Sequence, residues 1–368
     1  MSKFLSGLSV LMLGSLIVFP CESFANNDET EVNIGGAVRL NYGWKDYDND
    51  SDGAFDFELF AVDVDITKGK WFVDSQFRFY QTFNAIHHAE VGYNFDDDNR
   101  LAVGVSQVPF GISPYASHGF WFGGTYYLGF EDDYDAGVKW TKTSGDWTFD
   151  TAYFFNSEYD DSARYGRYSF DIASTDVSDN KEDGQANFRA QYQWGDHVIG
   201  ASLQAGKFRN RTTNAQGDHA AAAVHFDGHF DSWNIQLQHI YYDYEAAPEL
   251  QTDNNRIAMS AFDFPFEIAT EANVTSFNVA KTFKVGNDFL DKVVCYNDFT
   301  YTATNNKPGL TDSIQNVTGC TLIKDGLYTY VDWIAGKNMW FAGGPGIGIY
   351  NGPEKWHSRL NINIGYYF

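Results

Sequence analysis

Hydrophobic and polar side chains alternate along most of this 368-residue chain. In the first clear segment, one face carries only apolar or aromatic side chains: Val32, Ile34, Val38, Leu40, Tyr42 and Trp44. Arg39 and Asn41 fall on the opposite face. A period of two residues is that of a β-strand with one apolar face. No convincing amphipathic helix interrupts the pattern, which therefore predicts an all-β protein.

The alternation predicts sixteen strands. The first begins at residue 31, and the others lie near 57–67, 70–82, 87–95, 100–108, 132–141, 146–156, 185–194, 197–208, 218–226, 232–243, 273–285, 291–303, 312–323, 327–336 and 357–368. Short turns between them alternate with longer loops, of which the third spans 109–131. An even number of strands with this alternation is typical of a transmembrane antiparallel β-barrel. The loop region 244–285 has room for one further strand pair.

The two ends of the chain predict where the barrel resides. Lys3 precedes an apolar run from Leu5 to Phe19, and Ser23-Phe24-Ala25 provides a cleavage site with small residues. Residues 1–25 are therefore predicted to be a signal peptide and residues 26–368 the mature barrel. The last strand alternates apolar side chains up to Phe368, which is typical of barrels in the outer membrane of Gram-negative bacteria. No segment approaches the ~18 consecutive apolar residues of a membrane-spanning helix.

Composition and charge exclude some classes of function. The formal net charge of -24 argues against nucleic-acid binding, because that function needs clustered lysine and arginine. Aromatic residues make up 18% of the chain, as expected if aromatic girdles mark both membrane interfaces. Acidic runs at 46–52, 96–98 and 131–133 are interpreted as solvated loop faces. The predicted partners are outer-membrane lipid, lipopolysaccharide and small hydrophilic solutes.

A barrel of sixteen strands encloses an aqueous channel unless a plug fills it. No segment is long enough for a separate plug domain, so the pattern predicts a water-filled pore. The third long loop, 109–131, is rich in aromatic residues and glycine. Because it resembles the third loop of porins, which folds into the lumen, it is expected to fold inward and form a constriction lined by Ser113, Tyr115, His118, Trp121 and Tyr126. The alternative is that these side chains only pack the loop against the inner wall.

Strand parity predicts five cationic side chains that line the pore: Arg39, Arg78, Lys139, Arg189 and Arg359. Closure of the barrel is expected to bring the first and last strands together, and with them Arg39 and Arg359. Such a patch would attract anions. The alternative is that carboxylates on neighbouring strands, such as Asp74, Glu90 and Asp135, pair with these cations and remove any selectivity.

Two cysteines of the mature chain are candidates for a disulfide. A hairpin centred near Lys307 and Pro308 places Cys295 directly opposite Cys320. A weaker motif, Asp48-Asn49-Asp50-Ser51-Asp52-Gly53, resembles the start of a calcium loop with Asp48, Asp50 and Asp52 as ligands. Leu59 stands where such a loop has its final glutamate, so a solvated loop is the alternative. No nucleophile or cofactor motif is found in the sequence, so neither catalysis nor a cofactor is predicted.

Three segments resemble the phosphate-selective porin O and P family: 105–111, 312–317 and 356–368. The resemblance implies a sixteen-stranded porin, usually a homotrimer, that passes small solutes passively. Phosphate-selective members carry many lumenal cations, whereas this chain has 25 Lys+Arg against 49 Asp+Glu. The predicted function is thus an outer-membrane porin without enzymatic activity. The alternatives are a channel specific for phosphate, other anions or oligosaccharides, and a closed structural or adhesin barrel.

Overall fold

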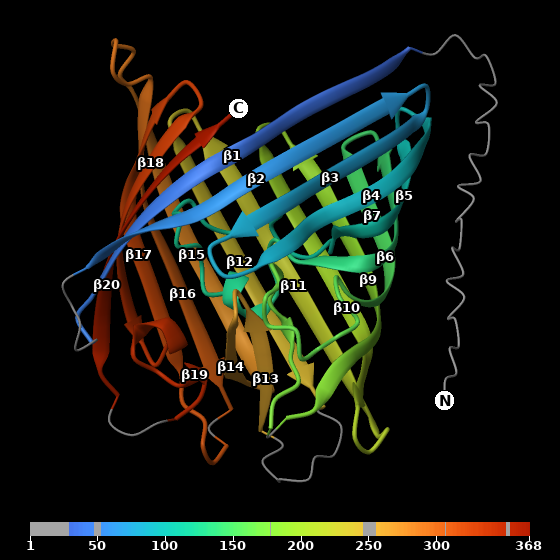
Figure 1. Cartoon of the computed structure of the whole chain (residues 1–368), viewed down its shortest axis with the longest axis vertical. Helices are drawn as coiled ribbons and strands as arrows, with labels where there is room; N and C mark the ends of the chain where they lie inside the picture. Colours follow the sequence, from blue (N-terminus) through green and yellow to red (C-terminus); the bar gives the residue numbers. More distant parts are fainter. Residues whose placement is uncertain (1–28, 48–52, 177, 246–254, 306, 351–353) are drawn as a thin grey trace, which may run out of the picture.

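The computed structural model describes the chain except for residues 1–28, 48–52, 177, 246–254, 306 and 351–353. The predicted signal peptide and the calcium candidate at Asp48, Asp50 and Asp52 therefore lie outside the described residues. Sixteen antiparallel strands form a closed barrel (Figure 1). The predicted fold class and strand number are confirmed.

The barrel strands coincide with the predicted segments, although several begin earlier than the alternation indicated. In chain order they are β1 (Thr30–Lys45), β2 (Ala54–Lys68), β3 (Trp71–Tyr80), β4 (Asn84–Asp96), β5 (Asn99–Gln107), β6 (Tyr134–Ser144), β7 (Trp147–Ser157), β9 (Asn180–Trp194), β10 (His197–Asn210), β11 (Gln216–Phe230), β12 (Trp233–Tyr244), β15 (Glu271–Lys284), β16 (Lys292–Thr304), β17 (Ser313–Lys324), β18 (Leu327–Lys337) and β20 (Trp356–Tyr367). β1 pairs with β20 and closes the cylinder.

The two faces of the wall differ in polarity. Apolar side chains on the outer face stay exposed in the isolated chain, Ile34 by 71%. Tryptophans stand on this face where short turns join the strands, as at Trp71, Trp147 and Trp194. Phe55 and Phe155 mark the opposite ends, where the long loops begin. An apolar band between aromatic belts is the surface that a bilayer requires.

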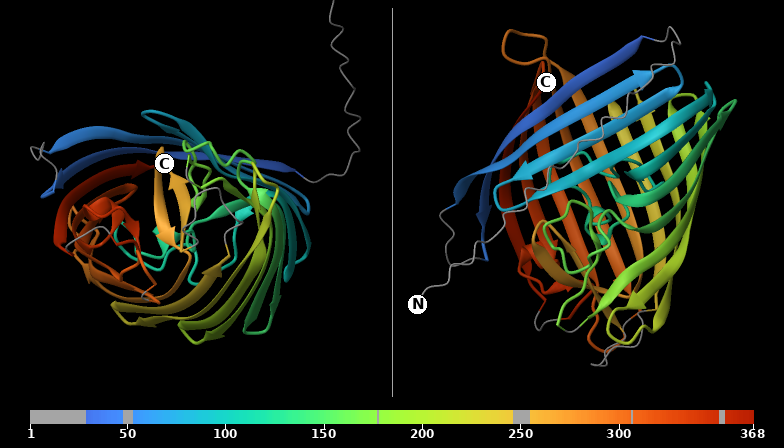
Figure 2. Two further views of the ribbon diagram at one scale, coloured as in Figure 1. Left: turned by 90° about the horizontal axis from the view of Figure 1, so that it is seen from below. Right: turned by 45° about the vertical axis from the view of Figure 1, so that its right-hand side comes forward.

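A second, smaller sheet lies inside the barrel at the long-loop end (Figure 2, left). It has the strand order β19 (Gly346–Ile347), β14 (Phe264–Ala269), β13 (Arg256–Ala261) and β8 (Asp171–Ile172). Its side chains share one hydrophobic core with inward-facing residues of the wall, among them Phe154, Phe208 and Tyr242. The 244–285 region does contain an extra strand pair, but that pair belongs to this inner sheet.

The inner sheet is a feature that the strand alternation did not predict. Each contributing loop is too short to fill the barrel alone. Three loops from distant parts of the sequence pair their backbones and together narrow the lumen at this end. Among the described residues, the helices are two short 3-10 turns, Tyr126–Leu128 and Trp340–Ala342, and no helix has the length and apolar character needed to cross a bilayer.

Cys295 on β16 and Cys320 on β17 lie directly opposite each other, and their sulfur atoms are bonded. The bond closes a covalent loop across a sequence separation of 25 residues. Such a loop restricts the unfolded chain more than the folded one.

Replacing both cysteines by serine (Cys295→Ser with Cys320→Ser) is expected to lower the free energy of unfolding by about 3 kcal/mol, because the unfolded chain regains conformational entropy. Thermal unfolding of the refolded protein in detergent measures the change. Reduced wild-type protein is the control and should unfold like the double variant. Equal melting temperatures for oxidised wild type and the double variant would contradict the prediction.

Candidate functional site: the loop across the lumen

Residues 108–133, here called the crossing loop, leave β5 and span the lumen before they return to β6. On the far side, the loop meets Asp298 on β16 and Asp332 on β18, which face the lumen. The backbone N–H groups of His118 and Gly119 donate to Asp298 Oδ2 at 2.7 and 3.0 Å, and that of Trp121 donates to Asp332 Oδ2 at 3.2 Å. Charged acceptors form stronger hydrogen bonds than neutral ones, so these two carboxylates anchor the loop.

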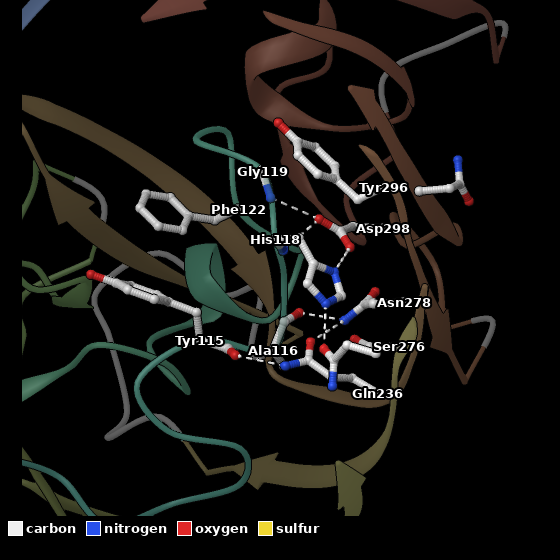
Figure 3. A network of polar contacts seen from close by, with 12 residues as sticks. Tyr115, Ala116, His118, Gly119, Phe122, Gln236, Ser276, Asn278, Tyr296 and Asp298 are labelled. Atoms are coloured by element: carbon white, nitrogen blue, oxygen red, sulfur yellow. Dashed lines mark hydrogen bonds and ion pairs between the residues drawn. The ribbon is translucent and has the colours of Figure 1, made fainter. Parts of the chain in front are cut away.

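His118 adds an ion pair to this anchor (Figure 3). Its Nδ1 lies 2.7 Å from Asp298 Oδ1, and its Nε2 lies 2.5 Å from Asn234 Oδ1 on β12. Both ring nitrogens therefore face oxygen acceptors, an arrangement that suits the doubly protonated ring. Burial lowers the pKa of His118, but the contact with Asp298 outweighs it, so the pKa is raised above its ordinary value.

The near limb of the loop is fixed by neutral polar groups of the wall. The backbone N–H of Gly111 donates to Ser202 Oγ at 3.0 Å, and that of Ile112 donates to Gln238 Oε1 at 2.7 Å. Gly111 has a φ of 56°, and a Cβ atom there would stand 2.2 Å from Gln238 Oε1. Glycine is thus required where the loop turns inward.

Glu131 joins the two limbs of the crossing loop. Its carboxyl group contacts the hydroxyl of Thr125 and accepts the backbone N–H of Ala116 at 2.9 Å. Burial, together with the nearby charges of Asp298 and Asp132, raises the pKa of Glu131 to about 8. The interpretation of residues 131–133 as a solvated acidic face is wrong: all three are buried, because the loop that carries them folds into the barrel.

The predicted constriction residues occupy different environments. Ser113 lines a polar cavity, and Tyr115 donates to Asp132 Oδ2 at 2.8 Å while stacking on Phe122. His118 serves as the anchor described above. The Trp121 ring is covered by the guanidinium of Arg359, whose Cζ lies 3.9 Å from the ring centroid. Tyr126 is only 3% exposed and belongs to the hydrophobic core. His118 is held against the inner wall, as the packing alternative states, whereas Tyr115, Trp121 and Tyr126 also line an aromatic cavity beside the loop.

Three of the five predicted pore cations are paired with carboxylates. Arg39 NH2 lies 2.7 Å from Glu58 Oε1, Arg189 NH2 lies 2.9 Å from Asp150 Oδ2, and Lys139 Nζ lies 3.9 Å from Glu90 Oε2. Of the three partners considered from the sequence, only Glu90 pairs with one of these cations in the described chain. The wall there carries balanced charge.

The other two cations stack on aromatic rings. The Cζ atom of Arg78 lies 4.2 Å from the ring centroid of Tyr168, and Arg359 covers Trp121. Neither guanidinium forms an ion pair with a carboxylate among the described residues. Arg39 and Arg359 are on paired strands but are not opposite each other, because the register pairs Arg39 with Gly365 and Arg359 with Lys45. The expected contact between the two arginines is therefore wrong.

Two cavities flank the crossing loop. One of about 320 Å³ lies between the loop and the wall of β3 to β9 and is lined by charged and polar groups, including Asp74, Glu90, Arg100, Lys139 and Arg189. The other, of about 210 Å³, lies between the loop, β1 to β3 and the inner-sheet loops, and is lined mainly by aromatic rings with Arg39, Arg78 and Glu58. The lumen is thus polar on one side of the loop and largely aromatic on the other.

Sequence reasoning missed the two anchors, Asp298 and Asp332, and the stacking partner Tyr168. Strand parity contained part of the signal, because Asp298 alternates with the inward-facing Tyr296 and Thr300. An acidic side chain at an inward position far from the loop gives no indication of which segment it will hold. Tyr168 lies in a loop, where no periodicity indicates its direction.

No protein-family model and no curated protein matches the sequence. Solved structures do match the fold. The structure is similar to OmpT of Vibrio cholerae at 14% identity, with a TM-score of 0.58, covering 94% of this chain and 99% of that one. It is similar to the outer membrane channel DcaP of Acinetobacter baumannii at 12% identity, with a TM-score of 0.63, covering 92% and 97%. An anion-selective porin from Comamonas acidovorans matches at 11% identity, with a TM-score of 0.56, covering 92% and 100%. The chain has the porin fold.

Replacing the main anchor, Asp298→Asn, is expected to loosen the crossing loop, because the variant loses the charge that faces His118 and two backbone N–H groups. We expect the free energy of unfolding to fall by about 1–3 kcal/mol. Thermal unfolding of the refolded protein tests this. Asp196→Asn removes the same charge from an exposed turn and should leave stability unchanged. Equal stability of the two variants would argue against the anchor.

The pKa shifts predict weaker loop attachment at alkaline pH. Glu131 binds its proton more tightly in the folded protein than in the unfolded chain. Its contribution to stability is therefore lost as pH rises from 4.5, the ordinary pKa of a glutamate, towards about 8. The raised pKa of His118 acts in the same direction. Its contribution to stability is lost as pH rises above 6.5, the ordinary pKa of a histidine. Thermal stability should therefore fall between about pH 6.5 and 8. Glu131→Gln, which mimics the protonated acid, should flatten this dependence, whereas Glu31→Gln at an exposed site should not.

Proposed function

We propose that this protein is an outer-membrane porin through which small hydrophilic solutes and ions diffuse passively. The observation that carries the proposal is a closed barrel with an apolar outer face, a charged inner wall and a loop anchored across the lumen. The fold of the outer membrane channel DcaP supports it. We also propose that residues 1–25 are removed on export.

The mechanism is steric and electrostatic. The barrel wall excludes lipid, and the crossing loop, anchored to the far wall at Asp298 and Asp332, narrows the lumen. Paired charges such as Arg189 with Asp150 hold water against the wall without a strong field of either sign. The inner sheet narrows the long-loop end further, so we expect a small conductance. We propose no enzymatic role, in line with the lack of a nucleophile or cofactor motif in the sequence.

A second candidate is a channel with preference for anions, including phosphate as the family resemblance implies. The observation that favours it is Arg78, which lines the aromatic cavity without a carboxylate partner among the described residues. We expect the preference for anions to be weak, because Arg39, Lys139 and Arg189 are already paired with carboxylates. An oligosaccharide channel would use Tyr115, Trp121 and Tyr126 as a sugar-stacking surface. This is disfavoured, because Tyr115 already stacks on Phe122, Arg359 covers the Trp121 ring and Tyr126 is buried.

We further propose a homotrimer in contact with lipid and lipopolysaccharide. One similar structure, of OmpT from Vibrio cholerae, is described as a trimer form. The exposed apolar face of the barrel suits contact with either lipid or a second subunit.

Insertion of the refolded mature protein into a planar bilayer is expected to give small, stable conductance steps. With balanced wall charges, the reversal potential in a salt gradient should show weak selectivity, and added phosphate should not block the current. Block by phosphate that is lost in Arg78→Gln would instead favour the anion-specific channel. Absence of any conductance would overturn the porin proposal and favour a closed barrel.

A further inference from the structure

Three buried aspartates meet where the crossing loop rejoins the wall. Asp133 ends the loop, Asp135 lies at the start of β6, and Asp171 lies on β8 of the inner sheet. One carboxylate oxygen from each residue lies within 4.8 Å of the others. Asp135 and Asp171 are each only 1% exposed, and Asp133 is buried. Three like charges at this separation in a water-poor site repel one another strongly.

The surrounding residues add more negative than positive charge. Glu158 is buried beside Asp171, and Glu182 interacts electrostatically with Asp133. The cation in contact is Arg167, whose NH1 lies 3.2 Å from Asp171 Oδ2 and 3.7 Å from Glu158 Oε2. Among the described residues, one guanidinium therefore contacts two of the five carboxyl groups of this cluster.

Carboxylate oxygens in this cluster lack donors. The Oδ1 atoms of Asp133 and of Asp135 are buried and accept no hydrogen bond from any described residue. A buried polar atom without a partner is costly, so native structures supply one from protein, water or an ion. Arg167 does not supply it, because its other N–H groups donate to the backbone oxygens of Arg164 and Asp161.

We propose that this cluster binds one calcium ion, with Asp133, Asp135 and Asp171 as ligands and Glu158 and Glu182 completing the anionic shell. Ligands that are all oxygen, mostly charged and nearly free of water suit Ca²⁺, which takes six to eight oxygens in flexible geometry. Mg²⁺ prefers to keep several waters, and Zn²⁺ favours histidine and cysteine, neither of which lies in the cluster.

The ion would join three parts of the molecule. Asp133 belongs to the crossing loop, Asp135 to the barrel wall and Asp171 to the inner sheet through the pairing of β8 with β13. Calcium would therefore fix both structures that narrow the lumen. This site uses other residues than the sequence motif at Asp48, Asp50 and Asp52, which lies outside the described residues. Binding of the ion does not depend on whether the barrel conducts.

Calorimetric titration tests the proposal on mature protein refolded in detergent without lipopolysaccharide and freed of metal with a chelator. CaCl₂ should bind at one tight site per chain and raise the melting temperature by several degrees, whereas MgCl₂ should bind far more weakly. Asp135→Asn and Asp171→Asn should each weaken calcium binding at least about tenfold. Asp97→Asn, in an exposed turn, removes an equal charge and should leave the affinity unchanged.

Two results would overturn the proposal. Absence of a tight calcium site in wild-type protein would mean that protons neutralise the cluster, and Asp135→Asn should then be at least as stable as wild type. If Asp97→Asn loses as much calcium affinity as Asp135→Asn, the ion binds to exposed carboxylates and not to the buried cluster. If the aspartate variants fail to fold, Tb³⁺ luminescence on wild type decides. Lifetimes in H₂O and D₂O should report few coordinated waters for the buried site and many for a surface site.

Discussion

Backbone hydrogen bonding between β1 and β20 is the interaction on which the rest of the structure depends. In the hydrocarbon layer, no water is available to satisfy a free strand edge, so a sheet can span the membrane only when it closes on itself. Closure makes every strand alternate between lipid and lumen. The outward face from Val32 to Leu40 and the inward position of Arg39 follow from this one constraint.

Once the barrel is closed, its interior must be filled with groups that satisfy one another. In this protein, acidic side chains accept many of the hydrogen bonds inside the barrel. Asp298 and Asp332 accept backbone N–H groups of the crossing loop, Asp132 accepts the hydroxyl of Tyr115, and Glu131 joins the limbs of the loop. A strongly acidic composition is therefore not only a property of the outer loops. Part of the negative charge is an internal set of anchors for segments without regular hydrogen bonding.

Pairing of polar groups also accounts for the charge balance of the lumen. Arg189 is matched by a carboxylate on the adjacent strand and Lys139 by one two strands away, whereas Arg78 and Arg359 are held over aromatic rings. Charge matching keeps water in the barrel with little net field, and the aromatic packing of the inner sheet limits the free cross-section. A narrow, weakly selective passage is the transport behaviour that this combination favours. The acidic cluster around Asp135 lies at the junction of the wall, the crossing loop and the inner sheet.

The sequence by itself determined the barrel, because alternation with a period of two is local and each strand can be recognised from its own residues. It also placed Cys295 opposite Cys320, since a hairpin register depends only on the turn between its strands. The inward direction of the crossing loop was expected from the resemblance of this third loop to that of porins. The partners of that loop were not, because Asp298 lies 180 positions beyond His118 and nothing local connects them. The inner sheet and the meeting of Asp133 with Asp171 were decided only by tertiary structure, since irregular loops carry no periodicity and their contacts form only inside a closed barrel.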